Sequence, residues 1–145
     1  MTYLIISYII IFLAGFINST MDKSQSHFTR SIFYKLNPLY WGPESWSSKY
    51  VNNDYTKGRK KWKGIVIPVI FTDWWHLAKT LMNLFHSIGA IFILLSSSFL
   101  LTLSLYQLVL IFILYFWIFG LGFTIGWDYL LDRNFLIYRK LNMFK

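Results

Sequence analysis

With 145 residues the chain is long enough for one domain, which we expect to span residues 1–145. Its residues are 56% apolar and only 14% charged, against about 45–50% and about 25% in soluble proteins. Met1–Met21 and Thr80–Trp127 contain no charged residue, which excludes an ordinary water-soluble globule. The absence of cysteine excludes a disulfide scaffold and a thiolate metal site. The net charge of +8 lies beside apolar segments, so we expect no nucleic-acid partner.

Three apolar segments are each long enough to cross a bilayer as a helix, since about 20 residues span a hydrocarbon core of about 30 Å. We predict membrane spans at about 3–19, 74–98 and 104–131. No basic residue precedes the first span, as one would in a cleaved signal peptide, so we expect this span to be retained. Thr72 is the expected N-cap of the second helix, and a short polar turn near residue 100 follows it. The predicted fold class is an all-α membrane protein with three transmembrane helices.

The basic residues are confined to one side of this arrangement. None lies in the N-terminal tail or in the turn near residue 100. By the positive-inside rule we expect a multi-pass protein of the cell membrane, with its N-terminus outside and its long loop (residues 21–71) and C-terminus in the cytoplasm. The residues that carry this prediction are Lys23, Arg30, Lys35, Lys49, Lys57, Arg59, Lys60, Lys61, Lys63, Lys79, Arg133, Arg139, Lys140 and Lys145.

The cytosolic loop is both aromatic and basic, a composition typical of a segment that lies among lipid headgroups. The run Lys57–Lys63 is expected to bind anionic headgroups of the lipid bilayer, at about 1 kcal/mol per basic residue near the surface. Gly64–Phe71 is apolar but interrupted by Pro68 and too short to span, so we predict an interfacial lead-in to the second helix.

Polar residues from all three spans are predicted to reach the cytosolic level of the bilayer together. Asp73 and His76 are three positions apart and share one helix face, as carboxylate and imidazole pairs do in metal-binding bundles. Because ionisable groups at membrane depth are costly, this convergence favours a functional site. Mixed oxygen and nitrogen ligands suit zinc, manganese or iron(II), which could activate water against a lipid or phosphate ester. The candidate metal ligands are Asp22, His27, Asp73 and His76, and Asp128 is the candidate catalytic base that orients water, or a further ligand.

These features allow three functions, and the sequence leaves all three open. The first is a non-catalytic membrane component that binds lipid headgroups or a protein partner at its cytosolic face. Its three carboxylates would face water or pair with Lys23, Lys79 and Arg133. The second is the metal-dependent hydrolase just described. The third is an oligomeric ion or proton conductor, whose pore would be lined by a polar stripe that runs from Asp73 to Ser87.

Two further features bear on how the helices associate. Gly122 and Gly126 are four positions apart and permit close approach of another helix, either within the chain or in a homo-oligomer. His86 lies deeper in the second span, and we expect a neutral histidine bonded to a neighbouring helix.

Three stretches of the chain resemble a known family when taken together. They are Gly15–Asn18 with Met21–Asp22 and His27–Phe28, then Trp41–Trp46 with Lys49–Tyr50, then Thr72–Leu77. In these stretches the chain is similar to a family of small, uncharacterised integral membrane proteins of bacteria and their phages. The resemblance implies that the polar residues singled out above coincide with the characteristic stretches of that family. It supplies no catalytic residues.

Overall fold

The computed structural model describes residues 1–136, so the C-terminal basic residues Arg139, Lys140 and Lys145 lie outside the described part. The chain is mostly helical, and three segments are long and apolar enough to cross a membrane. They are α1 (Thr2–Ser26), α3 (Trp74–Leu95) and Leu105–Leu130, which consists of α5 (Leu105–Thr124) and the π-helical turn η7 (Ile125–Leu130). The prediction of three candidate spans is confirmed.

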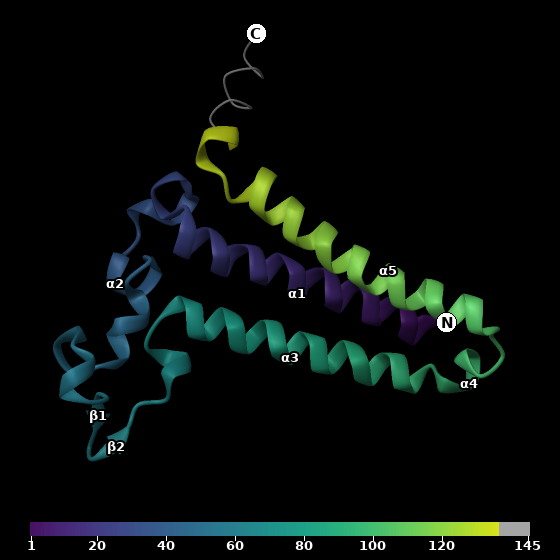
Figure 1. Ribbon diagram of the computed structural model, residues 1–145, viewed down its shortest axis with the longest axis horizontal. Coiled ribbons are helices and arrows are strands. Elements are labelled where there is room, and N and C mark those ends of the chain that lie inside the picture. The colour runs from purple at the N-terminus through teal and green to yellow at the C-terminus, as the bar shows by residue number, and fades with distance from the viewer. Residues whose placement is uncertain (137–145) are drawn as a thin grey trace, which may run out of the picture.

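α1 is the central helix, because α3 packs on one side of it and α5 on the other (Figure 1). Small residues bring the helices close: the hydroxyl of Ser7 on α1 donates to the carbonyl oxygen of Gly89 on α3 at 3.0 Å. A side chain at Gly15 would overlap the carbonyl oxygen of Phe119 on α5. Membrane helices associate through such close packing and hydrogen bonds, because lipid provides little hydrophobic drive between them. The buried apolar residues of α1 are Leu4, Ile11, Ala14 and Met21.

The first span is longer than predicted. α1 has 25 residues and ends at Ser26 instead of near residue 19, so the loop begins at His27. At 1.5 Å per residue this helix is about 38 Å long, which exceeds a hydrocarbon core of about 30 Å. Its last turns stay helical although they are polar, because Lys23 and Ser24 are buried against other parts of the chain.

The second span begins where predicted but is capped by a different residue. Asp73, and not Thr72, is the N-cap of α3, and its side chain accepts a hydrogen bond from the backbone N–H of His76. Asp73 acts as the cap because its carboxylate accepts this N–H at 3.0 Å, and a negative charge also suits the positive end of the helix dipole. α3 ends at Leu95, three residues before the predicted end, and is followed by the short helix α4 (Ser97–Leu100).

The third span begins at Leu105 and ends one residue before the predicted boundary. Ser104 and Gln107 form a reciprocal capping box at its start. At its end the backbone N–H of Leu131 donates to the carbonyl oxygen of Gly126 at 2.9 Å, a five-residue spacing that widens the helix. The N-terminus and α4 lie at one end of the bundle, and the loop lies at the other (Figure 1).

Gly122 and Gly126 pack within the chain. A Cβ atom at Gly122 would overlap the carbonyl oxygen of Phe12, and one at Gly126 would overlap the hydroxyl of Ser19. Both glycines are therefore covered by α1. A homo-oligomer formed through them would require α1 to separate from α5.

The loop is built from short elements instead of one long helix. A small β-hairpin, formed by β1 (Lys61–Trp62) and β2 (Ile65–Val66), projects from the loop, and the chain as a whole is mostly helical, as predicted. Lys63 and Gly64 at its turn both have positive φ, 49° and 83°, as tight hairpin turns require. The elements are η1 (Phe28–Arg30), η2 (Ile32–Lys35), α2 (Pro38–Trp41), η3 (Ser45–Lys49), η4 (Val51–Asn53), η5 (Tyr55–Lys57), β1 (Lys61–Trp62), β2 (Ile65–Val66) and η6 (Val69–Phe71).

Aromatic stacking fixes the loop to the start of α3. The ring of Trp41 in α2 stacks on Trp74 at 4.5 Å between centroids and on Phe33 at 5.0 Å. Offset stacking of this kind contributes about 0.5–1.5 kcal/mol per pair beyond simple burial. The loop is therefore packed against the bundle at the level where α3 begins.

Candidate functional site

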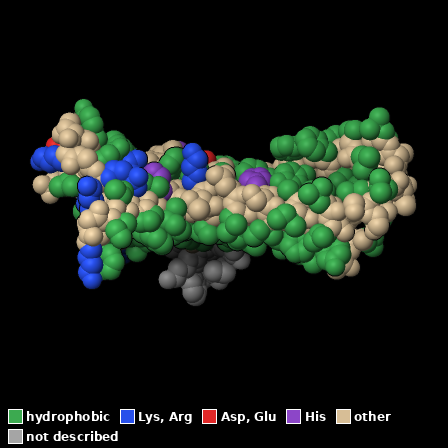
Figure 2. Space-filling view, turned by 90° about the horizontal axis from the view of Figure 1, so that it is seen from below, with side chains coloured by type: hydrophobic (Ala, Val, Ile, Leu, Met, Phe, Trp, Pro, Cys, Tyr) green, Lys and Arg blue, Asp and Glu red, His purple; other side chains and the backbone are tan. Residues whose placement is uncertain are grey.

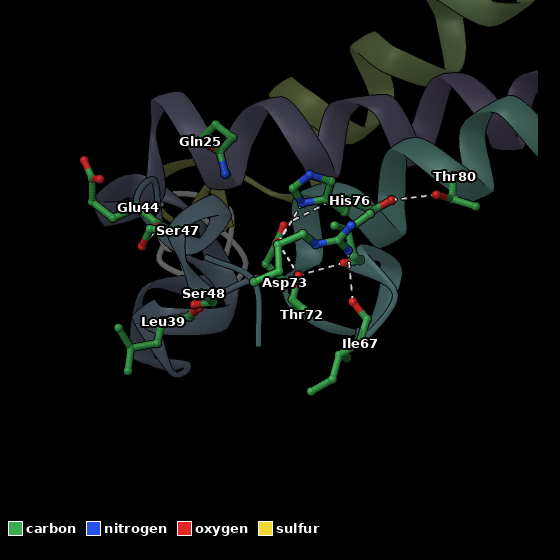
Figure 3. Close-up of polar contacts among 12 residues, drawn as sticks. Gln25, Leu39, Glu44, Ser47, Ser48, Ile67, Thr72, Asp73, His76 and Thr80 are labelled. Carbon is green, nitrogen blue, oxygen red and sulfur yellow. Dashed lines mark hydrogen bonds and ion pairs between the residues drawn. The ribbon is translucent and has the colours of Figure 1, made fainter. Parts of the chain in front are cut away.

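Asp73 and His76 form a close pair at the start of α3 (Figure 3). Oδ2 of Asp73 lies 2.7 Å from Nδ1 of His76 and also accepts the hydroxyl hydrogen of Thr72 at 2.9 Å. Oδ1 accepts the backbone N–H of His76 at 3.0 Å. Asp73 is fully buried, whereas the side chain of His76 is 14% exposed. A carboxylate that holds one imidazole nitrogen fixes the orientation of the ring, as in histidines that bind metals or accept protons.

The other predicted ligands do not join this pair. Asp22 is half-buried on α1, and Asp128 is exposed in η7. His27 packs edge-on against Trp127 at 5.0 Å, and its Nδ1 is buried without a hydrogen-bond partner. Within residues 1–136, no three side chains of the ligand types His, Cys, Asp or Glu come close enough to hold a metal ion.

The prediction of a four-ligand metal site is thus not supported by the arrangement of the described residues. Asp73 and His76 supply two ligands, whereas catalytic zinc sites use three protein ligands. The physical reason is the side-by-side arrangement of the helices. α3 and α5 flank α1 on different sides, so residues at one depth need not be neighbours. Asp22, His27 and Asp128 are not brought into one site with this pair. Their expected roles as ligands or base therefore stay predictions.

A buried ion pair that the sequence analysis missed closes the loop end of the bundle. Nζ of Lys23 lies 2.8 Å from Oδ2 of Asp132, and it also donates to the carbonyl oxygen of Trp127 at 3.1 Å. Lys23 is only 2% exposed, and Asp132 is 8% exposed. The pair joins the end of α1 to the segment after η7, across more than 100 residues of sequence. No spacing rule could reveal it, because it depends on how α1 and α5 pack.

Asp132 is held ionised by its surroundings. Burial alone would raise its pKa, but the hydrogen bonds from Lys23 and from the backbone N–H groups of Phe135 and Asn134 outweigh burial and lower the pKa below its ordinary value. Nη2 of Arg30 lies 3.6 Å from the same carboxylate. The segment that follows η7 is therefore tied to both α1 and the loop.

The ion pairs proposed from sequence proximity do not form. Lys23 pairs with Asp132 and not with Asp22, since its side chain lies beside η7. Nζ of Lys79 lies 4.6 Å from the centre of the Trp75 ring, and the Arg133 guanidinium lies 4.0 Å from the Tyr34 ring. These cations face aromatic rings, a contact worth about 0.5–1 kcal/mol at exposed sites.

His86 is bonded to the neighbouring helix, as predicted. Its Nδ1 lies 2.8 Å from the hydroxyl oxygen of Tyr115 on α5, and its ring packs at 5.1 Å from Phe119. The contact connects α3 directly to α5 and satisfies a polar group deep in the bundle.

The polar stripe of α3 faces away from α1. Beyond the buried Asp73, its members Thr80, Asn83 and Ser87 are all exposed. The hydroxyls of Thr80 and Ser87 donate to carbonyl oxygens one turn earlier, at 2.8 and 3.0 Å. Asn83 lies near the middle of α3, so its amide is the stripe's most polar group at membrane depth.

The hairpin and the helical turn η6 that follows it expose large apolar side chains beside basic ones. Trp62 is 65% exposed, Ile65 is 70% exposed and Phe71 is 68% exposed. On the face seen in Figure 2, Lys and Arg side chains gather over one end of the molecule, and the opposite end shows only hydrophobic and uncharged atoms. The basic end is the one that carries the loop, where the run Lys57–Lys63 lies.

The three apolar helices and the basic loop end define the class of the protein: by length and composition it is a helical, multi-pass membrane protein. No protein-family model, curated protein sequence or solved structure matches the chain. The resemblance to the small membrane proteins of bacteria and phages therefore stays a prediction.

Proposed function

We propose that the protein is a non-catalytic component of the cell membrane whose loop end binds anionic lipid headgroups. In this proposal the loop and the C-terminus lie in the cytoplasm and the N-terminus lies outside, as the positive-inside rule requires. The proposal takes the loop end as the functional face, because the described basic residues lie there or at the helix ends beside it.

The hairpin is the observation that carries the proposal. Trp62 and Ile65 occupy one cross-strand pair next to the turn, and both are more than half exposed. Exposed apolar side chains of this size are expected to lie in an apolar environment. Tryptophan in particular prefers the boundary between headgroups and acyl chains. A hairpin tip of this composition therefore fits the interface of the bilayer that the three helices cross.

The charge around the hairpin supports a preference for anionic lipid. Lys57, Arg59, Lys60, Lys61 and Lys63 lie within or next to the hairpin, and Asp54 is the nearest acidic residue in sequence. At about 1 kcal/mol for each basic residue near the surface, five such residues would favour an anionic over a neutral surface by several kcal/mol. Screening by salt would weaken this preference.

The depth of the hairpin in a bilayer tests the proposal. Because the chain has no cysteine, Ile65→Cys provides a unique site for a nitroxide spin label. The full chain would be reconstituted in nanodiscs of phosphatidylcholine with or without phosphatidylglycerol. We expect the label at position 65 to be protected from a water-soluble relaxation agent and accessible to oxygen, more so with phosphatidylglycerol and less so at high salt.

Thr56→Cys is the matched control, because Thr56 is exposed in the same loop but outside the hairpin. We expect its label to face water in both lipid mixtures. Equal exposure of the two labels to water would show that the hairpin does not enter the interface and would refute the proposal.

Labelling in intact cells tests the orientation. A membrane-impermeant maleimide should react with Thr102→Cys, in the turn between α4 and α5, without permeabilisation. It should react with Thr56→Cys only after permeabilisation. The reverse pattern would place the loop outside and contradict a cytoplasmic lipid-binding face.

A second candidate function is favoured by the exposed stripe of α3. Thr80, Asn83 and Ser87 lie on the face turned away from α1, where an amide in lipid would lack hydrogen-bond partners. Several copies arranged with these faces together would satisfy Asn83 and give the polar interior that an ion or proton conductor needs.

Disulfide crosslinking distinguishes this assembly from a single chain. Asn83→Cys should crosslink copies of the chain in native membranes, whereas Leu84→Cys, exposed but one position round the helix, should not. If the crosslinked oligomer conducts, Asn83→Leu should abolish proton or cation flux into liposomes. Equal crosslinking at both positions, or none at either, would rule out assembly through this stripe.

A further inference from the structure

Two pockets lie next to each other on the loop and share two residues. The first is apolar, has a volume of about 460 Å³ and is lined by the hairpin and the segment after it. The second has a more polar lining and a volume of about 290 Å³, and lies between α2, η4, the base of the hairpin and the start of α3. Ile67 and Phe71 line both. We name them the apolar groove and the polar pocket.

The polar pocket offers hydrogen-bond donors and one cation. Among residues 1–136, Lys60 is the only charged residue that lines it, and none of their carboxylates does. The amide oxygen of Asn37 already accepts the N–H of Leu39 at 2.9 Å, which leaves its NH₂ group to donate. Burial and the negative charge of Asp73 raise the pKa of Tyr40, so its hydroxyl stays protonated. Such a set of donors fits a phosphate oxygen better than a cation.

Strand alternation places the cation on the same face of the hairpin as Trp62, Ile65 and Ile67 of the apolar groove, with Val66 alternating to the other face. Trp62 pairs with Ile65, and the backbone N–H of Ile67 donates to the carbonyl oxygen of Lys60 at 3.1 Å, two residues further along each strand. Because side chains alternate between faces, Lys60 and Ile67 at the base lie on the same face as Trp62 and Ile65 at the tip. The face is therefore basic at one end and apolar at the other.

We propose that one anionic phospholipid binds to this face, with its phosphate in the polar pocket beside Lys60 and an acyl chain along the apolar groove. The proposal rests on the proposed function for the position of the hairpin at the lipid surface, and adds a defined site for a single lipid. A lipid fits better than a soluble phosphate ester, because the groove that continues from the pocket is lined by Trp62, Ile65 and Phe71.

Adjacent asparagines provide a charge-matched test. Asn52 and Asn53 both have left-handed backbones, with φ of 53° and 61°, a conformation that aspartate also tolerates. Asn53 lines the polar pocket, and Asn52 does not. Asn53→Asp and Asn52→Asp therefore make the same change in net charge at neighbouring positions, and only the first puts a carboxylate into the pocket.

Native mass spectrometry of the full chain in detergent, titrated with phosphatidylglycerol, would measure the bound lipid. We expect one tightly bound lipid per chain. Asn53→Asp should weaken its binding at least about fivefold, the effect of about 1 kcal/mol for a unit charge at a lipid phosphate. Asn52→Asp should leave it unchanged. Lys60→Gln should act like Asn53→Asp, and Lys61→Gln, on the opposite face of the hairpin, should not.

Two further measurements are needed. One distinguishes a lipid phosphate from a soluble phosphate ester, and the other distinguishes failure of this site from failure of the proposed function. Trp62→Ala, at a residue that lines the apolar groove and not the polar pocket, should weaken phosphatidylglycerol binding and leave the weak binding of soluble glycerol 3-phosphate unchanged. Equal affinity for the two ligands would overturn the acyl-chain part of the site. Equal losses in Asn53→Asp and Asn52→Asp, or no bound lipid in the unmodified chain, would overturn the site. In either case the spin label at position 65 would still report whether the hairpin enters the bilayer, so the proposed function is judged separately.

Discussion

α1 and α5 are both apolar enough to cross a membrane, yet one lies inside the bundle and the other outside. In their most apolar stretches 44% of the residues of α1 are buried, against 6% for the third span, although the third span has the higher mean hydropathy, 2.5 against 2.0. In water the more apolar helix would be the more buried one. In lipid the order reverses, because side-chain size and hydrogen bonding decide which faces meet.

The difference can be followed in particular residues. α1 presents the small residues Ser7 to α3 and Gly15 to α5, so both neighbouring helices can approach it closely. The third span approaches α1 closely at Gly122 of α5 and at Gly126 of η7. The remainder of α5 carries large exposed side chains suited to acyl chains: Leu105, Phe112, Phe116, Trp117 and Leu121. The effect of a substitution on the stability of the bundle should therefore depend on which helix face carries it, and not on the residue type alone.

The largest effect is expected from filling the contact between α1 and α5. Gly122→Leu would overlap the backbone of α1 at Phe12, so we expect the bundle to lose about 3 kcal/mol or more, or to fail to assemble. Gly120→Leu should be nearly neutral, because no atom lies within 4 Å of a Cβ atom there. Thermal unfolding in detergent would measure both. Similar losses in the two variants would show that α1 is not packed against this face.

The buried ion pair should give the next largest effect. Lys23→Met removes the partner of Asp132 and leaves a buried carboxylate with no lysine, which costs about 3–5 kcal/mol in comparable cases. The double variant Lys23→Met with Asp132→Leu should recover much of this loss, because it removes the unpaired charge as well. A double variant no more stable than the single one would contradict a pair that acts as a unit. Unfolding in detergent is again the measurement.

The same pair should make stability depend on pH in the acid range. The pKa of Asp132 is lower in the folded chain than the value of about 3.9 expected when unfolded, so the pair contributes fully above about pH 4. Its contribution is lost as the pH falls through the folded pKa, because protonation then favours the unfolded chain. Asp132→Asn should flatten this part of the profile. Asp54→Asn, at an exposed carboxylate, should change it much less; equal changes would argue against the buried pair as the cause.

The smallest effect is expected where α1 meets α3. Ser7→Ala removes the hydrogen bond to the carbonyl oxygen of Gly89 and should cost about 0.6 kcal/mol, the average for hydrogen bonds between membrane helices. Ser98→Ala, exposed in α4, provides the control and should be neutral. A steric-trapping measurement of bundle stability has the necessary sensitivity. An unchanged Ser7→Ala variant would assign this contact to packing alone.

The fold could be predicted from sequence to the level of individual spans, and the candidate site only in part. The starts of α3 and α5 fall within one residue of the predicted positions, because loss of charge and capping residues are local signals. The predicted end of α1 falls seven residues before the observed one, because Lys23 is charged and its burial depends on a distant partner. Asp73 and His76 do lie together, as the spacing of three predicts, but through a cap contact: Asp73 precedes α3, and its carboxylate accepts the N–H of His76 and contacts the imidazole ring.

Two features could be predicted without any knowledge of packing: the chain has three helices long and apolar enough to cross a bilayer, and its described basic residues gather at one end. Both follow from local sums of side-chain polarity. Packing between distant parts of the chain makes α1 central, pairs Lys23 with Asp132, and keeps Asp22 and Asp128 from joining Asp73 and His76 in one site. Those outcomes depend on the rotation and the packing side of each helix, which contacts between distant residues set and which hydropathy does not encode.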